Sequence, residues 1–80
     1  MNLYLLTQND INGYDTYDSC VVVANSEDEA KNIHPAWYQT FGEDRCSWTD
    51  NTDKVNCTYL GEYAGDYKKS PIICASFNAG

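Results

Sequence analysis

The sequence predicts a small α+β domain, an antiparallel sheet of about four strands with one helix, in the order β-β-α-β-β. Three observations favour this fold. Several short apolar segments have the length and composition of strands, one serine-initiated segment has the pattern of a helix start, and no repeat or linker divides the chain. Because 80 residues is the size of one domain, we expect a single domain spanning residues 1–80.

The first two strands are expected at residues 2–7 and 19–24. The segment "NLYLLT" is apolar on both faces, which suits a strand covered on at least one side. The segment "SCVVVA" is continuous and rich in β-branched residues, which makes it the strongest strand signal in the chain.

The last two strands are expected at residues 54–60 and 70–77. In "KVNCTYL" the apolar residues alternate, which places Val55, Cys57 and Tyr59 on one face. In "SPIICASF" the proline falls at the start of the strand, where its missing N–H is tolerated.

A helix is expected from Ser26 to His34. Ser26 is a suitable N-cap, and Glu29 three residues later completes a capping box. Pro35 disfavours helical geometry at the residue before it, so the helix is expected to end at His34. The residues predicted to face the core are Ala30, Ile33 and His34.

Between this helix and the third strand, residues 36–53 contain both tryptophans and no clear period. A connection this long in a small domain is often functional. Large aromatic side chains usually go into burial, so one interpretation is that Trp37, Phe41 and Trp48 close an open edge of the core. In the other interpretation, Trp37 or Trp48 is an anchor for a partner.

The segment "QNDINGYDTYDS", residues 8–19, joins the first two strands. Aligned on Gly13 as a calcium loop, it has Gln8 and Ser19 where aspartate and glutamate are needed, so calcium is not expected. Asn12-Gly13 favours a turn. We expect a projecting loop whose partner-binding residues are Tyr14, Asp15, Tyr17 and Asp18, an aromatic and acidic surface.

Acidic residues outnumber basic ones by 12 to 5, giving a net charge of -7 and a pI near 4.2. We therefore expect no direct nucleic-acid binding, because that binding needs a basic surface that neutralises the phosphates. Anionic membranes are disfavoured for the same reason. The charge also suggests nucleic-acid mimicry, in which carboxylates occupy a partner's basic groove. Besides the loop aspartates, the acidic surface would use Asp10, Glu27, Asp28, Glu43, Asp44, Asp50 and Asp53.

We expect no signal peptide, because Met1 is followed at once by a strand-like segment, and we therefore expect the four cysteines, Cys20, Cys46, Cys57 and Cys74, to be free thiols. No two of them have the spacing that holds zinc within one turn, so neither a metal nor a cofactor is expected. The single histidine, His34, has no partner in sequence that would orient it for catalysis. We therefore expect no catalytic residue and no enzyme.

The opening "LYLLTQNDINGYDTYDSCVVVANSEDEAKNIHP" and the closing "ICASFNAG" resemble small uncharacterised acidic proteins of phages and mobile elements. The resemblance implies an inhibitor of host defence, such as an anti-CRISPR or anti-restriction protein, that acts in the host cytoplasm. Its partner would then be a host protein, such as a nucleic-acid-binding complex, and the inhibitor itself a monomer or homodimer. Two alternatives remain open: a small-ligand or nucleotide-binding protein, either monomeric or dimeric, and a structural or virion-associated protein.

Overall fold

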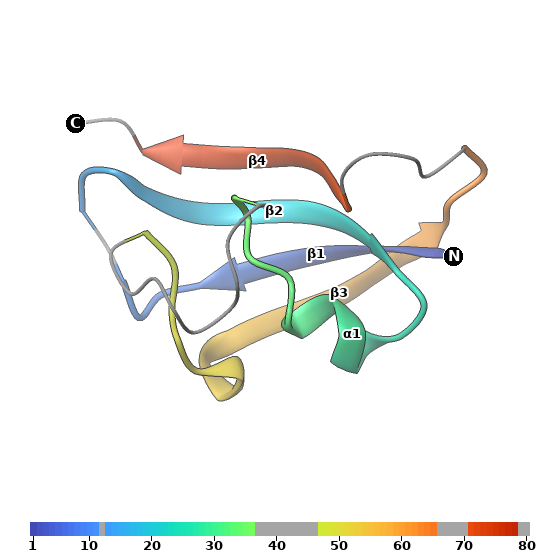
Figure 1. Cartoon of the computed structure of the whole chain (residues 1–80), viewed down its shortest axis with the longest axis horizontal. Coiled ribbons are helices and arrows are strands. Elements are labelled where there is room, and N and C mark those ends of the chain that lie inside the picture. The colour runs from blue at the N-terminus through green and yellow to red at the C-terminus, as the bar shows by residue number, and fades with distance from the viewer. Residues whose placement is uncertain (12, 37–46, 66–70, 79–80) are drawn as a thin grey trace.

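The computed structural model describes residues 1–11, 13–36, 47–65 and 71–78. These residues form four strands, one α-helix and one 3-10 turn. In chain order the elements are β1 (Asn2–Gln8), β2 (Thr16–Ala24), α1 (Glu27–Lys31), η1 (Thr52–Lys54), β3 (Val55–Glu62) and β4 (Ile72–Asn78). The fold is α+β, with a four-stranded antiparallel sheet and one short helix (Figure 1). The turn η1 was not expected, and the observed order differs from the expected one by this element.

The sheet is built around the β1–β2 hairpin. β3 pairs with the free side of β1 and β4 with the free side of β2, so the strand order is β3-β1-β2-β4, and all neighbours are antiparallel. Tyr4 lies opposite Val22, and Leu6 lies opposite both Cys20 and Cys57. Opposite residues in an antiparallel pair point to the same face. These side chains therefore define one face of the sheet.

That face carries the core. α1 contacts β1, β2 and β3 and lies over the sheet in Figure 1. It contributes Ala30, which is completely buried. The buried cluster consists of Tyr4, Leu6, Cys20, Val22, Ala24, Ala30, Trp48 and Val55. The opposite face is less covered: Leu3, Leu5 and Val21 are only partly buried there, although Val23, opposite Leu3, is buried.

Two expected boundaries were wrong by three residues, and the others lie within two residues of the observed ones. β2 begins at Thr16, three residues before the expected start, because Thr16 and Tyr17 already pair with β4. α1 ends at Lys31 and not at His34. Its C-cap is Asn32, where two bonds join residues three apart: the backbone N–H of Asn32 donates to the carbonyl of Glu29, and that of Ile33 donates to the carbonyl of Ala30. The side chain of Asn32 also donates to the carbonyl of Asp28. No helix among the described residues is both long and apolar enough to cross a membrane.

Candidate functional site

The turn that joins β1 and β2 occupies residues 9–15. Gly13 has a φ of 111°, and Asp15 has a φ of 60°, the left-handed region that few non-glycine residues adopt. The other residue of the expected Asn12-Gly13 turn, Asn12, lies outside the described residues. The chain thus reverses with two left-handed residues, of which only Gly13 was expected.

The turn is held by the side chain of Gln8, which is 7% exposed. Its Oε1 accepts from the backbone N–H of Asp10 and Ile11, at 2.9 and 2.8 Å. Its Nε2 donates to the carbonyls of Ile11 and Tyr17, at 2.8 and 2.9 Å. One buried amide therefore satisfies backbone groups on both sides of the turn and fixes its shape.

A second side chain closes the turn from the β2 side. Thr16 is buried, and its Oγ1 donates to the carbonyl of Gly13 at 2.9 Å. Beyond Gly13, Tyr14 is 77% exposed, the largest value among the large hydrophobic residues of the described chain. Asp15 is exposed beside it. The turn is thus a fixed support for an exposed tyrosine.

The expected loop residues do not all project. Asp18 is exposed, but it lies in β2 at an irregularity in the pairing with β4. Tyr17 also lies in β2 and is only partly exposed, packed against the core cluster. The expectation that Tyr17 belongs to a projecting loop was wrong, because β2 starts earlier and places its ring over the core face.

The ring of Tyr17 lies between two others. Its centroid is 4.8 Å from that of Phe77 on β4 and 6.4 Å from that of His34. His34 is buried, and its Nδ1 accepts a hydrogen bond from the backbone N–H of Ala36 at 3.0 Å. A ring nitrogen that accepts carries no proton, so this contact requires the neutral imidazole with its proton on Nε2. Tyr17 therefore joins β2, β4 and the segment after α1.

Trp48 is completely buried and belongs to the core cluster. The interpretation of Trp48 as core is confirmed, and the alternative that it anchors a partner was wrong, because no part of its side chain reaches the surface. Its indole N–H finds no acceptor among the described residues. Trp37 and Phe41 lie outside the described residues.

The acidic residues named above fall into separate groups. Asp10 is tied into the fold, because its Oδ2 accepts from the Oγ1 of buried Thr49 at 2.7 Å. Asp50 and Asp53 are exposed before and within η1. Glu43 and Asp44 lie outside the described residues.

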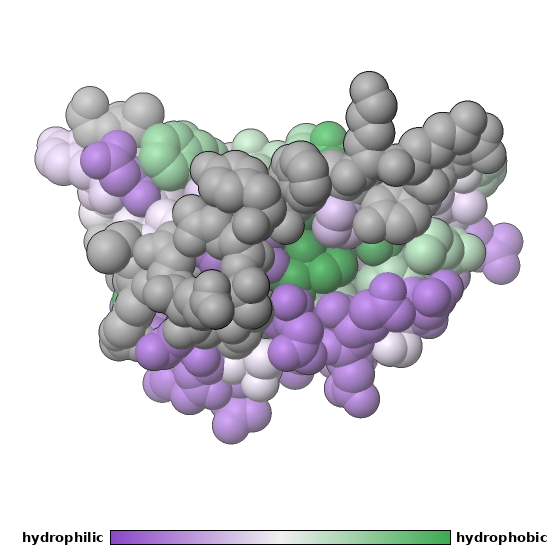
Figure 2. All heavy atoms as spheres, in the orientation of Figure 1, coloured by the Kyte–Doolittle hydropathy of each residue, from purple (hydrophilic) through white to green (hydrophobic). Residues whose placement is uncertain are grey.

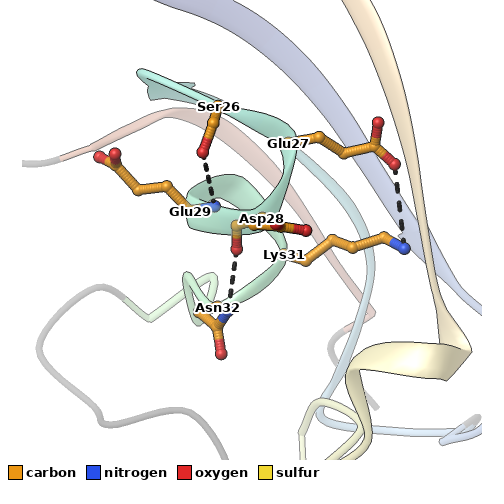
Figure 3. A network of polar contacts seen from close by, with 6 residues as sticks. All are labelled: Ser26, Glu27, Asp28, Glu29, Lys31 and Asn32. Carbon is orange, nitrogen blue, oxygen red and sulfur yellow. Dashed lines mark hydrogen bonds and ion pairs between the residues drawn. The ribbon is translucent and has the colours of Figure 1, made fainter.

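Three further carboxylates lie in α1. Ser26 caps the helix by accepting from the backbone N–H of Glu29 at 3.2 Å, and Glu27 lies 3.9 Å from the Nζ of Lys31 (Figure 3). Glu27, Asp28 and Glu29 are all exposed in the first turn, where the helix dipole favours negative charge. Only one lysine accompanies them in the helix. The exposed outer side of α1 is therefore strongly acidic.

Figure 2 shows the hydrophilic side chains as a band along the lower side of the molecule, the side on which Figure 1 places α1 and η1. Apolar side chains appear above this band. The acidic residues of α1 and η1 thus lie toward one side in this view, whereas the β1–β2 turn lies at one end of the sheet.

Cys20, Cys57 and Cys74 are free thiols, and Cys46 lies outside the described residues. Burial, with a smaller contribution from Cys74, raises the pKa of Cys20 from 9.0 to about 12. The pKa of Cys57 is also raised, first by burial and then by the carboxylate of Glu27. Both thiols are therefore poor nucleophiles at neutral pH. In the described part of the chain, no three histidine, cysteine or acidic side chains gather closely enough to hold a metal ion.

Sequence reasoning missed the residues that shape this end of the sheet: Gln8, Thr16 and Thr49. All three are polar residues in strands or loops, and nothing in their spacing distinguishes them from exposed ones. The one available signal was Gln8, a polar residue at the end of an apolar strand and directly before a turn. No protein family model, curated protein or solved structure matches this chain.

Proposed function

We propose that this protein is a non-catalytic binding module that recognises another protein through the tip of the β1–β2 hairpin. The hairpin patch consists of Tyr14, Asp15 and Asp18. The observation that carries the proposal is the 77% exposure of Tyr14 on a turn held by the hydrogen bonds of Gln8 and Thr16. A tyrosine on a supported turn loses little entropy when it binds, since hydrogen bonds already hold the backbone of the turn and the side chain has only two rotatable bonds to order.

The chemistry of the patch favours a partner with a basic and partly apolar surface. A tyrosine ring offers apolar area with a polar tip, and the exposed carboxylates of Asp15, next to it in the turn, and of Asp18, at the start of β2, favour lysine or arginine. The net charge of -7 would speed the encounter with such a surface. Together with the resemblance to phage proteins, this supports a host nucleic-acid-handling or defence protein as the partner, which the binding would inhibit.

The test is capture by immobilised protein from a lysate of candidate host cells. We expect Tyr14→Ser to abolish capture of a band that the wild type enriches, since a central aromatic anchor contributes on the order of 2 kcal/mol. The matched control is Tyr59→Ser, because Tyr59 is also an exposed tyrosine, at 58%, but lies on β3. Tyr17 is left unchanged, because its ring packs against the core. Equal capture by wild type and Tyr14→Ser, or no band specific to the wild type, would overturn the proposal.

A second candidate is nucleic-acid mimicry by the acidic side formed by α1 and η1. It is favoured by the exposed carboxylates of Glu27 and Asp28 in α1 and of Asp53 in η1. A complex of this kind weakens steeply as salt rises and is displaced by duplex DNA. We expect Glu27→Gln with Asp28→Asn to reduce capture in that case, with Tyr14→Ser leaving it unchanged. The reverse pattern would assign binding to the hairpin patch.

A further inference from the structure

β4 forms one border of the sheet, and residues 73–77 are exposed throughout. Figure 1 shows β4 along the upper edge, with no described element beyond it. Its two largest side chains, Ile73 and Phe77, are 48% and 47% exposed. The backbone of an edge strand offers unpaired N–H and C=O groups to another strand. β4 thus exposes both its outer edge and its apolar side chains.

β4 lacks two of the three features that usually prevent edge pairing. Proteins protect edges with charged residues, prolines or bulges. The seven residues of β4, "IICASFN", include no charge and no proline, in a chain with a net charge of -7. The other edge differs, because β3 carries Glu62 and a bulge before Gly61, whose φ is 151°. β4 has an irregularity of its own at Ile73, but it carries no charged residue. Among the described strands, β4 is therefore the border that is more open to pairing.

The pairing register shows that most of β4 is regular. Residues 74–77 of β4 lie opposite Val21, Cys20, Ser19 and Tyr17, so no residue of β4 is skipped there. The register skips one residue on each strand, Asp18 on β2 and Ile73 on β4, where the pairing is irregular. The central part of β4 can therefore present a continuous row of backbone groups to another strand.

We propose that β4 pairs antiparallel with β4 of a second copy of this chain, about a twofold axis at Ala75. This register places Ile73 of each copy opposite Phe77 of the other, so both exposed apolar side chains gain a cross-strand neighbour. It places Cys74 opposite Ser76 and Ala75 opposite itself, which keeps small side chains at the centre. Two four-stranded sheets then join into one of eight strands.

A second copy fits this edge better than a partner selected by charge. Two chains of charge -7 repel each other across their acidic surfaces, and β4 is a neutral strand along which they can approach. The twofold pairing is also self-complementary, as a dimer interface must be. One strand buries less area than the roughly 1,200–2,000 Å² of stable interfaces, so we expect association in the micromolar range, dependent on concentration.

Sedimentation velocity of the purified protein over a range of concentrations tests this proposal. We expect the wild type to pass from a 9.0 kDa monomer to a species of twice that mass. Ile73→Lys and Phe77→Glu should each weaken association at least tenfold, because each buries a charge opposite an apolar side chain. The double variant should recover most of the association, because Lys and Glu then lie opposite each other across the twofold axis.

Leu60→Lys is the matched control for Ile73→Lys. Leu60 is an aliphatic residue of the other edge with nearly the same exposure, 50%, and the change in charge is identical. Phe77 contacts Tyr17, so circular dichroism and urea unfolding must show that each variant is folded. A wild type that stays monomeric at hundreds of micromolar, folded variants that dimerise like the wild type, or a double variant without recovery would each overturn the proposal. The hairpin variant Tyr14→Ser should dimerise normally, which separates this proposal from the proposed function.

Discussion

The hydroxyl of Thr49 donates a hydrogen bond of 2.7 Å to the carboxylate of Asp10, a residue 39 positions earlier in the chain. Thr49 is completely buried beside Trp48, and Asp10 lies in the β1–β2 turn. Thr49 also accepts from the backbone N–H of Asn51 at 3.2 Å. This hydroxyl therefore connects the turn that carries Tyr14 to the segment that leads into η1.

We expect Thr49→Val to lower the free energy of unfolding by about 2 kcal/mol, because a hydrogen bond to a charged group is lost and an N–H loses its acceptor. Urea unfolding measures this change. Thr58→Val is the control, since Thr58 is exposed on β3 and should change stability by no more than about 0.5 kcal/mol. If Asp10→Ala and Thr49→Val were fully additive in the double variant, the hydrogen bond would not contribute.

Gln8 is the second position where a polar side chain supports the turn. We expect Gln8→Ala to cost about 3 kcal/mol, since it leaves several backbone groups of the turn without their partner. Gln8→Glu is the sharper variant, because its carboxylate can still accept from Asp10 and Ile11 but cannot donate to the two carbonyls that Nε2 now contacts.

Burial and the facing carbonyls should raise the pKa of the introduced carboxyl. A raised pKa in the folded state favours the protonated form, so the Gln8→Glu variant should be more stable at pH 4 than at pH 7, relative to the wild type. Urea unfolding at both pH values tests this. The same loss of stability at both would mean that the amide protons are not used as the structure shows.

The thiol of Cys20 makes stability depend on pH in the alkaline range. Its pKa is raised to about 12 by burial and by Cys74, so between pH 9 and 12 the unfolded chain loses this proton and the folded chain keeps it. The contribution of this thiol to the free energy of unfolding is thus fully present below pH 9. It is lost as the pH rises above 9, by up to about 1.4 kcal/mol per pH unit. We expect Cys20→Ala to remove this part of the slope in unfolding measured from pH 8 to 10.5. Cys74→Ser is the control and should retain most of it, whereas equal slopes in wild type and Cys20→Ala would contradict the assignment.

The strands could be predicted from sequence because their apolar patterns are local. Residues 2–7 and 19–24 fall within β1 and β2, and the capping box of Ser26 and Glu29 forms as expected. The start of β2 could not be predicted from the sequence, because "TYD", residues 16–18, has the composition of a loop and becomes part of a strand only through the pairing of β2 with β4. Secondary-structure propensity does not include that long-range contact.

The candidate site was predictable only in part. Exposure of Tyr14 follows from its place in a turn, but burial of Tyr17 depends on Phe77 and His34, which are far away in sequence. The buried positions of Gln8, Thr16 and Thr49 were not predictable, because a polar residue is buried only when its hydrogen-bond partners are in place. Those partners depend on the complete fold.

The strand order β3-β1-β2-β4 has a consequence for local opening. The two outer strands attach to opposite sides of the central hairpin and do not contact each other through the sheet, so each can detach without the other. β3 is also held by its contacts with α1, and α1 makes no comparable set of contacts with β4. In the monomer, amide protons of β4 should therefore exchange with solvent through separation from β2 alone, and those of β1 only when the whole sheet opens. We therefore expect protection from amide exchange to be highest in the N-terminal strand, β1, and lowest in the C-terminal strand, β4.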